Sequence, residues 1–89
     1  MGLNKREIVI IAETNRDNYS VEIKTLDSRL WQAVITITQP KKHYDVFTAR
    51  GALKTWTNLA DAIVYIQETC DDCKNVTIRI GAWTFSRVI

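Results

Sequence analysis

Hydrophobic and polar residues alternate with a period of two along three stretches of the chain, a pattern typical of strands that bury one face. These stretches are residues 19–23, 31–38 and 76–80. Residues 8–12 (IVIIA) are instead apolar at every position, which predicts a central strand covered on both faces. At Gly81 the alternation slips by one position before it resumes at Trp83, and this slip predicts a bulge or a bend.

A β-hairpin that runs into a helix is predicted in the middle of the chain. Arg50-Gly51 separates residues 44–49 from residues 52–56, and glycine permits the positive φ of a tight turn. A helix from Asn58 to Thr69 follows, with Asn58 as a capping residue. Its apolar positions recur at helical spacing: Leu59, Ala62, Ile63 and Ile66.

These elements predict an α+β fold, in which an antiparallel sheet of about five or six strands carries a single amphipathic helix on one face. The chain has 89 residues, of which 46% are hydrophobic and 25% charged, so it has the composition of a folded domain. No linker, repeat or low-complexity tract divides it. We therefore expect one domain over residues 1–89.

Composition narrows the functional classes only a little. No apolar run reaches the roughly 18–20 residues that span a membrane, so we expect no membrane partner. A secreted domain of this length that depends on disulfides usually has more than the two cysteines present, which favours a cytoplasmic location. The formal net charge of +2 is too small to indicate nucleic acid by itself.

The cysteine pair Cys70 and Cys73 forms a CxxC motif, but its position disfavours chemistry. It follows a helix C-terminus beside carboxylates, whereas a reactive thiolate needs a helix N-terminus or nearby cations. A zinc site needs about four ligands. His43 is the only histidine, so a second chain or an aspartate would have to complete such a site. We expect no metal, no cofactor, no small-molecule substrate and no enzymatic activity.

A basic cluster surrounds the predicted hairpin. Lys41, Lys42, Arg50 and Lys54 stand against one acidic residue in this segment, whereas residues 57–73 contain no lysine or arginine. Basic ribbons and sheets with exposed aromatic rings bind phosphates and stack bases, so these four cations are candidates for phosphate contacts. Phe47 is the candidate stacking ring. The alternative is a solvated charged loop in which Phe47 packs under a neighbour.

The C-terminal segment is rich in aromatic residues. Trp83 and Phe85 lie on a predicted terminal strand, and an unpaired strand recruits partners. The edge formed by residues 83–88 is therefore a candidate homodimer interface. Packing of the same two rings within their own chain is the alternative.

Residues 47–68 resemble a pattern found in small proteins encoded on plasmids and other mobile elements, some of them partition-associated accessory proteins. The pattern consists of an aromatic-Thr-x-Arg-Gly turn, an aromatic residue, a polar cap and a Leu-x-x-Ala helix. It is carried here by Phe47, Thr48, Arg50, Gly51, Trp56, Leu59 and Ala62. The resemblance covers a quarter of the chain and implies a role in the maintenance or regulation of DNA in a bacterial mobile element.

Two functions from different classes follow. The first is a non-enzymatic accessory module that contacts nucleic acid through its basic hairpin. The second is a module for protein interaction or self-association that uses its aromatic C-terminal edge and no nucleic acid. The sequence does not distinguish DNA, RNA and protein as the partner.

Overall fold

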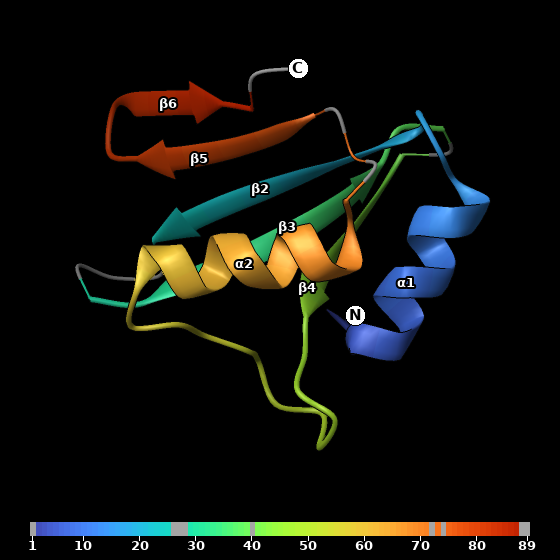
Figure 1. The fold of residues 1–89 in the computed structure, drawn as a ribbon, viewed down its shortest axis with the longest axis horizontal. Helices are drawn as coiled ribbons and strands as arrows, with labels where there is room; N and C mark the ends of the chain where they lie inside the picture. Colours follow the sequence, from blue (N-terminus) through green and yellow to red (C-terminus); the bar gives the residue numbers. More distant parts are fainter. Residues whose placement is uncertain (1, 26–28, 40, 72, 74, 88–89) are drawn as a thin grey trace.

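The computed structural model describes residues 2–25, 29–39, 41–71, 73 and 75–87 and shows an α+β fold with one six-stranded sheet and two helices (Figure 1). The elements are β1 (Gly2–Leu3), α1 (Lys5–Thr14), β2 (Tyr19–Thr25), β3 (Trp31–Ile37), β4 (Lys42–Val46), α2 (Leu59–Thr69), β5 (Val76–Ile80) and β6 (Trp83–Ser86). The strand order in the sheet is β1-β4-β3-β2-β5-β6.

The sheet is mixed, so the expectation of an antiparallel sheet is wrong. Strands β2, β3 and β4 form an antiparallel meander, and β5 and β6 form an antiparallel hairpin. However, β1 pairs with β4 in parallel, and β5 pairs with β2 in parallel. Alternation of side chains identifies a strand and its buried face but not the direction of its neighbour. The sequence pattern therefore could not reveal the two parallel pairings.

The expectation of a single helix is also wrong, because residues 8–12 belong to α1 and not to a central strand. Asn4 accepts a hydrogen bond from the backbone N–H of Glu7, and the Glu7 side chain accepts one from the N–H of Asn4. This capping box begins the helix. Within it, Ile8 is fully buried, and Ile11 and Ala12 pack against the same core one turn later. Five consecutive apolar residues suit either element, and here the cap and the i, i+3, i+4 spacing decide.

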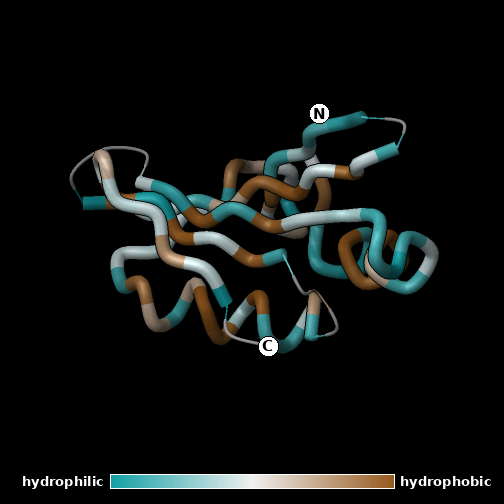
Figure 2. The backbone as a smooth tube through the Cα atoms, turned by 90° about the horizontal axis from the view of Figure 1, so that it is seen from above, coloured by the Kyte–Doolittle hydropathy of each residue, from teal (hydrophilic) through white to brown (hydrophobic). Residues whose placement is uncertain are grey.

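Both helices pack on one face of the sheet around a single core. The core joins Ile8 of α1 and Ile66 of α2 to Val21, Ile23 and Ile35 of the central strands. Viewed edge-on, α2 runs along this face (Figure 2). The alternate residues of the same strands point to the opposite face, are only partly buried and are mostly polar. Neither helix of the described chain is long and apolar enough to cross a membrane.

The predicted helix after the hairpin is confirmed: α2 begins after Asn58, whose side chain accepts a hydrogen bond from Ala60 N–H. The hairpin before it is shorter than expected. Beyond Val46 its arms are joined by a bridge between Phe47 and Leu53 and by the bond from Lys54 N–H to Val46 O. Gly51 has the positive φ expected at its turn, 86°. Figure 1 shows the resulting loop projecting away from the sheet.

Candidate nucleic-acid interface

The four predicted cations fall at two separate ends of β4. Lys41 and Lys42 are exposed where the chain enters this strand, beside the end of β3. Arg50 and Lys54 lie beyond the other end, in the projecting loop. Strands rise about 3.3 Å per residue, so β4 alone separates the two groups by about 13 Å. The fold therefore does not gather these cations into one cluster.

Lys54 is held against two aromatic rings. Its Nζ lies 5.4 Å from the ring centroid of Trp56 and 5.4 Å from that of Tyr65. The two rings contact each other, with their centroids 5.2 Å apart. A cation over an aromatic face is attracted by the ring quadrupole, which stabilises an exposed pair by about 0.5–1 kcal/mol. Lys54 is thus positioned by Tyr65 of α2 and by Trp56, two residues before the Asn58 cap, and it remains partly exposed.

Phe47 packs on the N-terminal strand. Its backbone N–H donates to Leu3 O over 2.7 Å, and a Cβ on Gly2 would overlap the Phe47 ring. The absence of a side chain at Gly2 is what allows the ring to lie there. Phe47 remains partly exposed, so its ring is fixed in position and still reaches solvent.

A cleft of about 650 Å³ opens where α1, α2 and the projecting loop meet. Its lining comprises Asn4, Lys5, Arg6, Val9, Phe47, Thr48, Ala49, Lys54 and Tyr65. Three of these residues are cationic, two are aromatic, and none is acidic. Basic residues alternating with rings are the chemistry of sites that contact a phosphate backbone and stack bases.

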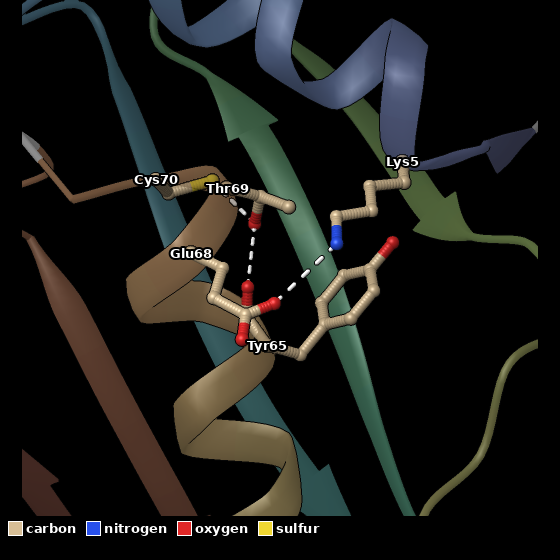
Figure 3. A network of polar contacts seen from close by, with 5 residues as sticks. All are labelled: Lys5, Tyr65, Glu68, Thr69 and Cys70. Carbon is tan, nitrogen blue, oxygen red and sulfur yellow. Dashed lines mark hydrogen bonds and ion pairs between the residues drawn. The ribbon is translucent and has the colours of Figure 1, made fainter.

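Lys5 of α1 contacts two residues of α2, Glu68 and Tyr65 (Figure 3). Its Nζ lies 3.4 Å from Glu68 Oε2 and 5.9 Å from the centroid of the Tyr65 ring. Both partners of the ion pair are more than half exposed, so the pair contributes at most about 1 kcal/mol to stability and can exchange for another anion. Glu68 thus partly neutralises the charge of Lys5.

The N-terminus of α1 lies at this cleft, and its partial positive charge is offset in part by the capping Glu7 carboxylate. The N-terminal end of a helix carries a partial positive charge, and Lys5 and Arg6 are the first two residues of this helix. Burial, and then the nearby Cys70 thiol, raise the pKa of Tyr65 above its ordinary value. Its phenol therefore stays neutral at physiological pH and does not offset the cations.

Sequence reasoning missed Lys5, Arg6 and Tyr65. The first two were overlooked because the apolar run after them was interpreted as a strand. Their signal was the Asn4-x-x-Glu7 pattern, which marks a helix start and places both cations in its first turn. Tyr65 has no such signal, because only the packing of α2 brings it under Lys5 and Lys54.

The cysteines lie apart from this cleft. Cys70 and Cys73 are free thiols that are each only 2% exposed, and burial raises the pKa of both. The nearby Tyr19 hydroxyl is buried without a hydrogen-bond partner among the described residues, and burial raises its pKa as well. No group of three or more potential metal ligands occurs in the described part of the chain. Because burial raises their pKa, both thiols stay protonated at physiological pH.

The candidate interface residues Trp83 and Phe85 lie on β6, an edge strand of the sheet. They are 70% and 51% exposed, and their rings stack with centroids 6.5 Å apart. The far end of the expected edge, at Val88, lies outside the described residues. Comparison of the chain with protein-family models, with curated proteins and with solved structures finds no match.

Proposed function

We propose that this protein binds a nucleic-acid strand, and not a small-molecule substrate, in the cleft between α1, α2 and the projecting loop. The observation that carries the proposal is the lining of this cleft, which contains three cations, two aromatic rings and no acidic residue, with Glu68 beside it paired to Lys5. Lys5, Arg6 and Lys54 would contact phosphates, and the exposed Arg50 would extend their track along the loop. Tyr65 and Phe47 would stack against bases.

A single strand suits this cleft better than a duplex. The aromatic rings of the cleft lie among its cations, and only an unstacked base can reach these rings. A duplex would offer the cleft only its phosphates. The likeness of residues 47–68 to accessory proteins of mobile elements favours DNA over RNA as the strand, and it favours a binding role without catalysis.

The small net charge sets the expected strength of binding. Since the whole chain carries only +2, attraction depends on the local cluster and not on the overall field. Three or four phosphate contacts on a single strand give a slope of log K against log salt of about −2 to −3. We therefore expect weak binding that is lost as salt rises.

The test is a titration of a fluorescently labelled oligonucleotide, followed by anisotropy at about 50 and 200 mM salt. Single-stranded DNA, duplex DNA and RNA of one sequence are compared. The cleft variant carries Lys5→Glu and Lys54→Glu, and the matched control carries Lys41→Glu and Lys42→Glu. Both variants change the net charge by the same amount. A difference in their affinities therefore reports the position of the lysines and not the total charge.

The expected result is a loss of affinity of at least about tenfold in the cleft variant, with a slope shallower by about 1–2. The control should lose less than about threefold in affinity. Its substituted residues lie at the far end of β4, and salt screens their charges over that distance. Equal losses in the two folded variants, or no binding by the wild type at low salt, would overturn the proposal.

A further inference from the structure

The edge strand β6 carries neither a charged side chain nor a proline, two features that commonly protect an edge. Its four residues, Trp83–Ser86, are all exposed. The opposite edge is protected, because β1 has only two residues and the Phe47 ring covers Gly2. Exposed edges that present aromatic side chains without charge can pair with further strands.

The backbone groups of β6 that face away from the sheet can be identified. Arg87 N–H donates to Val76 O, and hydrogen-bonded pairs alternate along an antiparallel ladder. It follows that Trp83 and Phe85 direct their N–H and C=O groups towards β5. Thr84, between them, directs its N–H and C=O groups outwards, where no strand of the described chain receives them.

The side chains of Trp83 and Phe85 lie on the face of the sheet that carries the helices. Phe85 pairs with Ile78 and Trp83 with Ile80, and Ile78 in turn pairs with the buried Ile23. Residues directly opposite each other share a face. Figure 1 shows that α2 runs over the central strands, and all four residues of β6 are exposed beyond it. A cavity of about 250 Å³ lies between α2 and the β5–β6 hairpin, and its lining includes Ile63, Ile78 and Phe85.

We propose that β6 pairs with β6 of a second copy of this chain in an antiparallel, two-fold symmetric arrangement centred on Thr84. The two Thr84 residues would exchange both N–H···O=C bonds, because these groups face outwards in each copy. One residue away, Trp83 would stand opposite the partner's Phe85, and Phe85 opposite the partner's Trp83. Such directly opposed, non-hydrogen-bonded pairs bring their side chains closest together.

The second copy fits this edge for two reasons. The first is symmetry: the order Trp-Thr-Phe places an aromatic ring against an aromatic ring twice, so the edge is complementary to itself. The second is charge. Arg87, the nearest cation along the chain, donates to the backbone oxygens of Asp71 and Cys73 over 2.8 and 2.6 Å. It is thereby directed towards its own chain and away from the outer side of β6. The exposed Arg79 pairs with Thr84 from β5, so it lies one strand away from the edge and on the face opposite the two rings.

The size of the contact predicts a reversible dimer. An aromatic side chain buries 150–250 Å² when covered, so the exposed parts of the two rings offer roughly 200–250 Å² per copy. The strand backbone and the half-exposed Ile80 add to this area. A stable interface buries about 800 Å² per partner, so we expect dissociation in the micromolar range or above.

The test is sedimentation equilibrium of the whole chain from about 5 to 500 µM, the range in which a contact of this size associates. The wild type should pass from 10.2 kDa towards twice that mass. Thr84→Pro removes an outward N–H and leaves the bonds to β5 in place, and Thr84→Val is its matched control. Trp83→Glu places a charge at the interface, and Ile10→Glu is its control on the exposed face of α1.

We expect Thr84→Pro and Trp83→Glu to weaken association at least about thirtyfold, as loss of a central contact does. Both controls should dimerise like the wild type. Circular dichroism confirms that each variant is folded, and Trp83→Glu preserves the test if the proline disturbs β6. A wild type that stays monomeric throughout would overturn the proposal and leave the edge to a strand of another protein. Dimers that persist in both folded interface variants would also overturn it.

Discussion

The two edges of the sheet differ in almost every respect. At the β1 edge, a two-residue strand, the Phe47 ring and the start of α1 surround a cleft lined with cations. At the β6 edge, a four-residue strand without charge exposes two stacked rings. Aromatic residues occur at both edges, so composition alone does not separate them. What differs is the neighbouring charge, which suits one edge to a polyanion and the other to an apolar strand.

The largest expected effect is a difference in the free energy of unfolding between substitutions at the two edges. Ile8 of α1 is fully buried against the sheet near the β1 edge, whereas Phe85 of β6 is half exposed at the other edge. We expect Ile8→Ala to lower the free energy of unfolding by about 2–5 kcal/mol, because it leaves a cavity in the core. Phe85→Ala should cost less than about 1 kcal/mol in the monomer. Urea denaturation at low protein concentration measures both, and equal losses would contradict the packing described for α1.

The second prediction concerns pH and the thiols that lie behind the β5–β6 hairpin. Burial raises the pKa of Cys70, Cys73, Tyr19 and Tyr65, so the folded protein retains protons that the unfolded chain releases. Stability should therefore be unchanged up to pH of about 8.5 and fall above it, more steeply beyond about 10 when the tyrosines of the unfolded chain ionise.

Denaturation midpoints measured from pH 7 to 10.5 follow this loss. In a Cys70→Ala, Cys73→Ala variant the decline should begin only near the ordinary tyrosine pKa of about 10. An unchanged onset in that variant would show that the thiols do not carry the effect.

The third prediction tests whether the rings of the cleft contribute to binding beyond its charges. Tyr65→Leu removes the ring beneath Lys5 and Lys54, whereas Tyr65→Phe keeps it. Stacking of one base on a ring is worth about 1–3 kcal/mol, so we expect Tyr65→Leu to weaken single-strand binding about five- to hundredfold. Tyr65→Phe should bind like the wild type. If both variants bind equally well, the cleft acts through its cations alone.

The smallest effect should come from the two helix caps. Asn4→Ala and Asn58→Ala each remove a side-chain acceptor at a helix start and should each cost about 1 kcal/mol in stability. Only Asn4→Ala should also weaken nucleic-acid binding, because the first turn of α1 holds Lys5 and Arg6. Thermal melts and anisotropy on the two variants make this comparison. Equal effects on binding would remove α1 from the interface.

The sequence predicted the elements of this fold better than their arrangement. Alternation correctly located β2, β3 and β5, and the cap with its spacing correctly located α2, because these signals are local. The apolar run at residues 8–12 is ambiguous by pattern, and the parallel pairings depend on which strands meet in space. Local patterns carry no information about either pairing partner or direction.

In the candidate site, too, single residues could be predicted from the sequence, whereas their arrangement in space could not. Lys54 could be chosen from its neighbours in sequence, but its association with Lys5 and Tyr65 joins three segments that are far apart in the chain. Lys41 and Lys42 are close to Lys54 in sequence and distant in the fold. Proximity along the chain was therefore a poor guide to which cations act together.

Mapping the contact residue by residue tests whether nucleic acid occupies the cleft at the β1 edge. The measurement is a ¹H–¹⁵N correlation spectrum of the labelled protein during titration with a short single-stranded oligonucleotide. We expect the shift changes to concentrate at residues 4–9, 47–54 and 65, with little change at Lys41, Lys42 or β6. Changes centred on Lys41, on Lys42 or on β6, with the cleft unaffected, would contradict the account.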